Sequence, residues 1–277
     1  MLYHRESNLK NSVYPTYYPK VPTKEALSDS ILLGETIFTS FRTFSGKVPF
    51  LEDHLKRLEL GSEFLFHCIL RREEVRLGIK TQIDKYIGKD LRIRITVFKT
   101  NNELDFFISA SLLDNFEIGP VRLLKAFKVR VPGLLPSYLK VGNYLETNLE
   151  IKRAQEKGYD DVLFLDNQNQ VLECSTSNIF GVKGDCIYTP VVNDLFLNGI
   201  TRQKIIEMMV AEKIKVLEVA LDFNALLESD EIFICNSVKG IRSVGKLHEK
   251  EFGIPKITAE INQIFNKLIE RNCEKEN

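Results

Sequence analysis

The sequence predicts an α/β protein of the α+β type, made of two α/β domains. Apolar residues alternate with period two in some segments and recur every three or four residues in others, so strands and amphipathic helices are interleaved along the chain. The 277 residues are enough for one large domain or two of moderate size. A turn-rich segment that ends in Gly119-Pro120 is the best connection between them. It predicts domains at residues 1–114 and 115–277.

The smaller N-terminal domain is predicted to contain two hairpins and two helices. Two candidate strands flank Ser45-Gly46-Lys47, a turn signal that predicts a hairpin. Leucines with helical spacing and acidic residues at the front predict an amphipathic helix over residues 51–66. A second helix is expected over residues 72–88, and a second hairpin over residues 91–113 with its turn at Asn101-Asn102.

The larger C-terminal domain begins with a strand over residues 121–129 and a helix from about Val141 to Lys157. Gly158 follows that helix and suits the left-handed conformation in which many helices end. Apolar segments separated by turn residues then predict an antiparallel meander of three strands. These strands cover residues 161–166, 171–182 and 186–192.

Three further elements complete the C-terminal domain. The first is an amphipathic helix for which Thr201 or a neighbour is the expected N-cap. The second is a strand that runs into a turn, and the third is a long amphipathic helix. They cover residues 202–213, 231–244 and 257–272.

Charge and composition exclude several classes of partner. Lys and Arg together number 38, as do Asp and Glu, so the chain lacks the basic field that nonspecific nucleic-acid binding requires. No stretch approaches the roughly 18 apolar residues of a membrane span, and the N-terminus lacks the apolar core of a signal peptide. The five cysteines are odd in number and have no CxxC spacing, which favours a reducing cytoplasm over a disulfide scaffold. Neither a nucleic acid nor a membrane is expected as a partner.

The sequence lacks the common catalytic signatures but contains an ordered set of other motifs. HExxH, GxSxG, GxxxxGK[ST] and GxGxxG do not occur, and no metal site is predicted. Five segments that carry polar residues within apolar runs follow one another along the chain. They read DHLKRL, LKVGNY, VLECSTSNIF, LNGITRQ and FICNSVKGI.

In this order, the five motifs resemble those of the pyridoxal-phosphate enzymes of fold type IV, the class IV aminotransferase family. This family includes branched-chain aminotransferase, D-amino-acid aminotransferase and 4-amino-4-deoxychorismate lyase. The resemblance covers about Gly34 to Val244, which is most of the chain. It implies pyridoxal 5'-phosphate as cofactor in a site between the two domains, and a small-molecule amino substrate. It also implies a homodimer in which the partner chain completes part of each site.

Three motif positions match residues that hold and activate the cofactor in this family. Lys140 matches the lysine that forms the Schiff base, which requires an accessible neutral amine. Glu173 matches the acid that pairs with the pyridine nitrogen and keeps the ring an electron sink. Tyr144 aligns with the tyrosine that hydrogen-bonds the phenolic oxygen, and Asn178 belongs to the family pattern E-x-x-x-x-N-x-F. Taken alone, Lys140 would be a solvated lysine, Glu173 an outward-facing strand residue and Tyr144 a core residue.

Other motif positions match the phosphate site of the family. Arg57 carries a planar guanidinium that suits bidentate contact with phosphate oxygens. Gly199-Ile200-Thr201 places the amides of Ile200 and Thr201 and one hydroxyl at a helix N-terminus, where the helix dipole attracts an anion. Ser237 matches the position that supplies a hydroxyl or amide on the other side of the phosphate. In isolation, Arg57 would be an exposed helix charge and Thr201 a helix cap.

Substrate contacts are predicted on the N-terminal strands and at one C-terminal turn. Arg92 and Arg94 share one face of a strand by period two, and the resemblance implies that this strand directs ligands for the substrate carboxylate into the site. A solvent-facing stripe is the open alternative for these two arginines. Thr39 and Ser40 match the strand that lines the pocket, and Val238 belongs to a stretch that resembles the Asn-Ser-Leu of the lyases.

The motifs favour the lyase, which releases pyruvate and 4-aminobenzoate, a folate precursor. The short spacing from Lys140 to Asn143 is shared by the lyases and the D-amino-acid aminotransferases, whereas branched-chain enzymes typically have one residue more. Lys99-Thr100-Asn101 stands where many lyases have a glycine-rich stretch, so an aminotransferase acting on D-amino acids or branched-chain amino acids is the alternative. A relative that has lost the cofactor is a third hypothesis, opposed by the joint presence of Lys140, Glu173 and Arg57.

Overall fold

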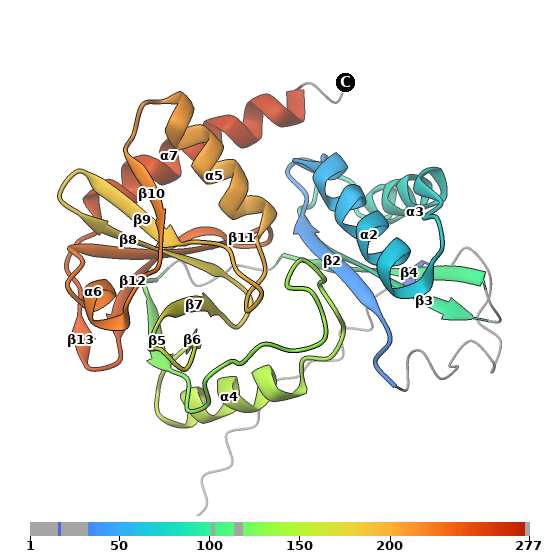
Figure 1. The fold of residues 1–277 in the computed structure, drawn as a ribbon. Helices are drawn as coiled ribbons and strands as arrows, with labels where there is room; N and C mark the ends of the chain where they lie inside the picture. Colours follow the sequence, from blue (N-terminus) through green and yellow to red (C-terminus); the bar gives the residue numbers. More distant parts are fainter. Residues whose placement is uncertain (1–15, 18–32, 101–102, 114–118, 275–277) are drawn as a thin grey trace, which may run out of the picture.

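The chain forms two β-sheets that lie beside each other, each with its own helices (Figure 1). A computed structural model describes residues 16–17, 33–100, 103–113 and 119–274. The predicted α/β class with two sheet-and-helix units is confirmed by this architecture. The predicted boundary at residues 114 and 115 lies outside the described residues, as does the turn at Asn101-Asn102, and both stay predictions.

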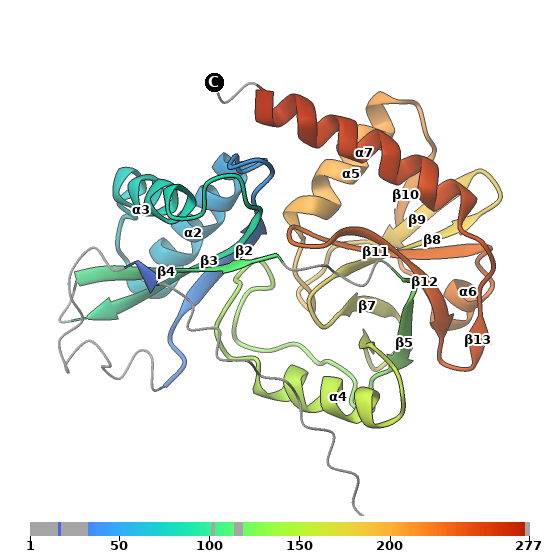
Figure 2. The same ribbon diagram turned by 180° about the vertical axis from the view of Figure 1, so that it is seen from behind.

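The smaller sheet has four antiparallel strands in the order β1-β4-β3-β2. Its strands are β1 (Thr16–Tyr17), β2 (Ile37–Arg42), β3 (Leu91–Thr100) and β4 (Glu103–Leu112). Helices α2 (Leu51–Phe66) and α3 (Arg72–Asp84) cover one face of this sheet (Figures 1 and 2). The helix predicted over residues 51–66 and the hairpin of β3 and β4 are confirmed.

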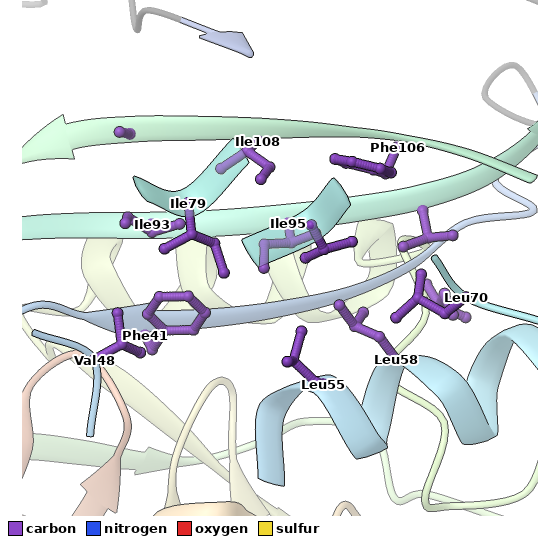
Figure 3. Packing of buried hydrophobic residues seen from close by; sticks show 14 of the residues in the cluster. Phe41, Val48, Leu55, Leu58, Leu70, Ile79, Ile93, Ile95, Phe106 and Ile108 are labelled. Atoms are coloured by element: carbon purple, nitrogen blue, oxygen red, sulfur yellow. The ribbon is translucent and has the colours of Figure 1, made fainter. Parts of the chain in front are cut away.

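The core of this unit lies between the sheet and its two helices. Figure 3 shows side chains from β2, β3, β4 and α2 meeting in one apolar cluster. Leu55 and Leu58 of α2 have no exposed surface, and neither do Ile93 and Ile95 of β3. Burying a leucine of this kind contributes about 1.5–3 kcal/mol to the free energy of unfolding. The leucines at helical spacing on α2 and the isoleucines at period-two spacing on β3 thus face each other, as the sequence pattern predicts.

The larger sheet is mixed and has the strand order β10-β9-β8-β11-β12-β5-β6-β7, with β13 paired to β12. Its strands are β5 (Val121–Lys125), β6 (Asp161–Leu165), β7 (Val171–Cys174), β8 (Asn178–Lys183), β9 (Cys186–Pro190), β10 (Val216–Val219), β11 (Glu231–Asn236), β12 (Gly240–Leu247) and β13 (Lys250–Glu251). Helices α5 (Ile200–Ala211) and α7 (Lys256–Glu274) pack over β11, and α4 (Leu145–Glu156) packs on β6 (Figures 1 and 2). The short helix α6 (Phe223–Leu227) precedes β11. No helix within the described ranges is long and apolar enough to cross a membrane.

The hairpin predicted around Ser45-Gly46-Lys47 is wrong in its second strand. The turn itself forms, because Phe44 and Lys47 exchange backbone hydrogen bonds of 2.8 and 3.0 Å. Ser45 and Gly46 both have positive φ, 51° and 80°, as a two-residue type I′ turn requires. The chain then enters α2 at Leu51 instead of continuing as a strand.

The helix predicted from Val141 begins four residues later, at Leu145. Residues 140–142 pair with the start of β2 instead of coiling. Phe38 N donates to Lys140 O and Gly142 N donates to Thr36 O, each at 2.8 Å. A Cβ on Gly142 would lie 2.1 Å from Thr36 Oγ1, so the close approach requires glycine. This pairing joins the two sheet units at Lys140.

The predicted antiparallel meander is wrong in its middle strand, because the segment over residues 171–182 forms two strands with different neighbours. Strand β7 pairs with β6, whereas β8 pairs with β9 and β11. Cys174 N donates to Ser177 O at 2.8 Å, which closes a tight turn between β7 and β8. Residues 175–177 therefore leave the sheet.

Candidate active site

A cavity of about 420 Å³ lies where the two sheet units meet. It brings together the predicted site residues, with the exception of Thr39. Those that line it are Arg57, Arg92, Arg94, Lys140, Tyr144, Glu173, Asn178, Ile200, Thr201, Ser237 and Val238. Strands β2 and β3 and helix α2 supply one wall. The C-terminal unit supplies the other wall, through the ends of β7, β8, β11 and α5 and the turns beside them.

Lys140 is held in the cavity by the backbone pairing described above, and its side chain is half-buried. Its Nζ donates to Tyr144 Oη at 3.1 Å. The same nitrogen lies 4.8 Å from the ring centroid of Phe38, whose ring meets that of Tyr144 edge-on at 5.5 Å. An amine in such a setting can exchange a proton with the neighbouring phenol or with a bound molecule.

Glu173 extends from β7 into the cavity and forms an ion pair with Arg130. The Arg130 Nη1 to Glu173 Oε1 distance is 2.5 Å, and Nη1 also donates to Leu195 O at 3.3 Å. Burial raises the pKa of Glu173, while the positive charges of Arg130 and Lys140 act in the opposite direction. The sequence analysis missed Arg130, because none of the five motifs contains it. Its position follows from a parallel bridge with Asp166, which no local pattern encodes.

Arg57, Thr201 and Ser237 form a polar cup at one end of the cavity. Arg57 Nη2 donates to Asn198 O at 3.0 Å, and the hydroxyl oxygens of Thr201 and Ser237 lie 2.9 Å apart. Burial lowers the pKa of Arg57 to about 10, and Tyr144 makes the largest contribution in the opposite direction. The guanidinium remains charged near neutral pH. A cation, two hydroxyls and the first amides of α5 are the groups that bind a phosphate.

The structure also corrects the roles expected for the segment before α5. Gly199, not Thr201, occupies the N-cap position, and the Thr201 hydroxyl pairs with Ser237. Asn178 Nδ2 donates to Leu197 O at 2.8 Å, and Asn178 Oδ1 accepts from Gly199 N at 3.1 Å. A Cβ on Gly199 would lie 2.1 Å from that oxygen. Asn178 therefore positions the turn before α5, and its direct contact with a cofactor stays a prediction.

Arg92 and Arg94 line the cavity from β3. The Arg94 guanidinium carbon lies 3.5 Å from the ring centroid of Phe38, and Nε donates to Thr96 Oγ1 at 3.2 Å. Burial lowers the pKa of Arg94, and the neighbouring charge of Arg92 acts in the same direction. The period-two spacing predicts that the two arginines share a face, and the structure places that face toward the cavity.

The substrate contact predicted for Thr39 is wrong. Side chains alternate across β2, so Phe38 and Ser40 line the cavity while Thr39 points the other way. Thr39 has no exposed surface, and its Oγ1 lies 2.7 Å from His54 Nδ1 on α2. Thr39 thus joins β2 to α2.

The cavity carries more positive than negative charge. Among the described residues that line it, the cations are Arg57, Arg92, Arg94, Lys140 and Lys239, and the carboxylate is that of Glu173. Arg130 already neutralises Glu173. The remaining cations favour ligands with phosphate or carboxylate groups.

Two solved structures share this fold. An aminotransferase of Brucella abortus bound to pyridoxal phosphate superposes with a TM-score of 0.84 at 24% identity, covering 92% of this chain and 98% of that one. A Legionella pneumophila protein provisionally named a 4-amino-4-deoxychorismate lyase superposes with a TM-score of 0.79 at 26% identity, covering 90% and 96%. The predicted fold, that of the fold type IV enzymes, is confirmed.

The chain belongs to the class IV amino-transferase family, whose model matches residues 36–247. A Rickettsia bellii protein that carries the name probable branched-chain-amino-acid aminotransferase is 30% identical over 266 residues, covering 91% of this chain and 90% of the relative. A Thermotoga maritima protein with the same name is 29% identical over 219 residues, covering 78% of each. The resemblance inferred from the five motifs is therefore confirmed, and the protein is a member of an enzyme family.

Proposed function

We propose that this protein is a pyridoxal-phosphate-dependent aminotransferase that moves an amino group from an amino acid to a keto acid. One observation carries the proposal. The cavity combines the Lys140 amine beside Tyr144 Oη, the Glu173–Arg130 pair, and the cup of Arg57, Thr201 and Ser237. An amine, a carboxylate and a phosphate site around one cavity are what this cofactor needs.

The residues present fit pyridoxal 5'-phosphate. The polar cup would hold its phosphate, Glu173 would pair with its ring nitrogen, and Lys140 Nζ would bind its aldehyde. When bound, this group withdraws electrons from the carbon that carries the substrate amine. Gly199 lacks the side chain that would displace Asn178 from the rim of the cup. Each of these roles can be removed by a single substitution.

The side chains of this protein supply the proton transfer, the charge pairing and the substrate binding. For amino transfer, Lys140 Nζ would take a proton from the α-carbon of the substrate and deliver it to the carbon that was the cofactor's aldehyde carbon. The hydrogen bond from Nζ to Tyr144 Oη orients that nitrogen. Arg130 pairs with the Glu173 carboxylate and opposes the rise in its pKa that burial causes. Arg92 and Arg94 would bind the substrate carboxylate through charge-assisted hydrogen bonds.

The comparisons support an aminotransferase better than the lyase that the motifs favour. The Rickettsia bellii and Thermotoga maritima relatives are both named as branched-chain enzymes. We propose amino acids with branched or other apolar side chains, or D-amino acids, as substrates, since Phe38 and Val238 add apolar surface to the cavity.

Aminodeoxychorismate lyase is the second candidate function. The similarity to the Legionella pneumophila protein supports it. The surplus of arginines would also suit a substrate with more than one carboxylate, such as aminodeoxychorismate. In that case the reaction would release pyruvate and 4-aminobenzoate and would need no amino acceptor.

The test is an end-point assay of the purified protein loaded with pyridoxal phosphate. Leucine, isoleucine, D-alanine and glutamate are each offered with and without a keto acid, and aminodeoxychorismate is offered alone. We expect amino transfer that depends on the keto acid and disappears in Lys140→Ala. Release of 4-aminobenzoate from aminodeoxychorismate without a keto acid, and no transfer from any amino acid, would establish the lyase instead.

We also propose that the protein is a homodimer. The segment between β5 and α4, which leads directly to Lys140, exposes a series of apolar side chains. They are Phe127, Val129, Val131, Leu134, Leu135 and Tyr138. Phe127 is 80% exposed, which is unusual for an aromatic residue in a row of apolar neighbours.

Light scattering should give about twice the 31.9 kDa chain mass, and Phe127→Glu with Leu134→Glu should shift the protein toward monomers. A wild-type protein that is monomeric and active would contradict this.

A cytoplasmic location is part of the same proposal. The cysteines at positions 68, 174, 186, 235 and 273 all form no disulfide. Free thiols in every position suit a reducing compartment.

A further inference from the structure

Arg202 is the largest fully buried side chain in the described part of the chain, and it does not line the cavity. It lies in the first turn of α5 and is 1% exposed. Its guanidinium donates to Pro190 O at 2.7 Å and to Glu218 Oε2 at 2.6 Å. Nη1 donates to Asn198 Oδ1 at 3.0 Å. A buried charge with this many partners holds several segments in one geometry.

Asn198 connects Arg202 to the polar cup. Its side chain accepts from Arg202, while its backbone carbonyl accepts from Arg57 Nη2 at 3.0 Å. Gln203 Nε2 donates to the same carbonyl at 3.3 Å. The position of the Asn198 peptide therefore sets where the Arg57 guanidinium lies.

The same short turn is held from its other side by Asn178, which bonds Leu197 O and Gly199 N. Asn178 and Arg202 are both buried, and together their hydrogen bonds fix residues 197–199, which precede α5. Arg57 is half-buried, and the hydrogen-bond acceptor that the structure gives it is the Asn198 carbonyl. A small rotation of this peptide would move the cation relative to the hydroxyls of Thr201 and Ser237.

We propose that Arg202 is a positioning residue for phosphate binding, which acts on Arg57 through Asn198. The proposal rests on the proposed function, because it takes the phosphate of pyridoxal phosphate as the ligand of the cup. Arg202 touches neither the ligand nor the reacting atoms. Its contribution is to keep Arg57 at the distance and angle that a phosphate requires.

The test compares the affinity of each variant for pyridoxal phosphate and for pyridoxal, which lacks the phosphate. Binding is measured by absorbance and fluorescence titration of protein stripped of cofactor. We expect Arg202→Met and Asn198→Ala each to weaken pyridoxal phosphate by about tenfold and to change pyridoxal affinity by less than about twofold. The double variant should bind pyridoxal phosphate about tenfold more weakly than the wild type, not a hundredfold, because both substitutions break the same set of contacts from Arg202 through Asn198 to Arg57.

Lys204→Met is the matched control, since it removes a cation from the same helix. Lys204 pairs with Asp53 and Glu207 outside the cavity. We expect this variant to bind both ligands as the wild type does.

Three outcomes would overturn the proposal. Equal losses of affinity for pyridoxal phosphate and pyridoxal would mean general destabilisation. Losses of affinity that multiply in the double variant would mean that Arg202 does not act on Arg57 through Asn198. Unchanged binding in Asn198→Ala would also overturn it, and this variant stays informative if Arg202→Met does not fold. A wild-type protein that binds pyridoxal phosphate no better than pyridoxal would instead contradict the proposed function, and this inference would fall with it.

Discussion

The two walls of the cavity are built in different ways. Phe38, Arg57 and Arg94 of the N-terminal wall stand on regular elements, so the period of a strand or helix sets their direction. The C-terminal wall is made at the ends of strands and helices and in the turns beside them. Lys140 precedes α4, and the turns after β7 and β11 also enter the cavity. Local pattern thus places the first wall, while contacts distant in sequence place the second.

The walls also differ in charge balance. Within the described residues, Arg92 and Arg94 form no ion pair, although both face the cavity. Glu173 on the other wall is paired with Arg130 at 2.5 Å. The N-terminal wall is therefore suited to bind the charge of a ligand. On the C-terminal wall, the protein itself compensates the charge of Glu173, and the amine of Lys140 is placed to move a proton.

The largest effect is expected on the C-terminal wall, at Lys140. Lys140→Ala should lower the turnover number by at least about 10³-fold, since proton transfer by a positioned base contributes on the order of 10²–10⁴. It should also abolish the absorbance band of bound pyridoxal phosphate. Tyr144→Phe keeps the amine and should retain the band. Activity within tenfold of the wild type in Lys140→Ala would show that another group moves the proton.

The next effect concerns the charge compensation of Glu173. Arg130→Met leaves a buried carboxylate without its partner and should lower the free energy of unfolding by about 3 kcal/mol, as measured by urea denaturation. The matched control is Arg122→Met, which breaks the exposed pair with Asp160. Exposed pairs contribute at most about 1 kcal/mol. Equal losses in the free energy of unfolding of Arg130→Met and Arg122→Met would show that the Glu173 pair contributes no more than an exposed pair.

A smaller effect is expected for the unpaired arginines. Arg94→Ala should raise the Michaelis constant for the amino substrate by about tenfold to a hundredfold, because a charge-assisted hydrogen bond contributes about 1.5–3 kcal/mol. The turnover number should change by less than about threefold, since Arg94 binds charge and moves no proton. Arg92→Ala tests the second arginine in the same way. A fall in the turnover number with an unchanged Michaelis constant would assign these residues to the chemical step.

The smallest effect is a pH dependence of stability at His54, beneath the N-terminal wall. Burial, Arg57 and Lys140 hold the pKa of His54 well below the usual 6.5. Below pH 6.5 the unfolded chain therefore binds a proton that the folded chain does not, so stability falls as the pH falls. The loss from this residue between pH 7.5 and 5.5 should be about 1.4 kcal/mol.

His54→Gln removes this ionisation and should flatten the decline by that amount, although it lowers stability at every pH by breaking the contact with Thr39. Urea denaturation at both pH values gives the slope. A variant whose stability declines as steeply as that of the wild type would show that His54 does not account for this window.

Whether a predicted element agrees with the structure depends on what determines that element, a local sequence pattern or contacts with distant residues. Helix α2 and the hairpin of β3 and β4 agree with the predictions because leucines at helical spacing and isoleucines at period two each bury one face. The start of α4 could not be predicted, since residues 140–142 pair with Thr36 and Phe38, about a hundred positions earlier. The split between β7 and β8 depends in the same way on their different neighbours.

The sequence by itself determined the alternation of strands and helices, the family, and the residue types that meet in the site. Lys140, Glu173 and Arg57 are recognisable because their motifs are local. Only the tertiary structure decided that Thr39 faces His54, that Arg130 compensates Glu173, and that Arg202 reaches Arg57 through Asn198. The physical reason is that a motif specifies a side chain and its near neighbours. Its burial, its charge partner and the direction in which it points depend on segments that only folding brings together.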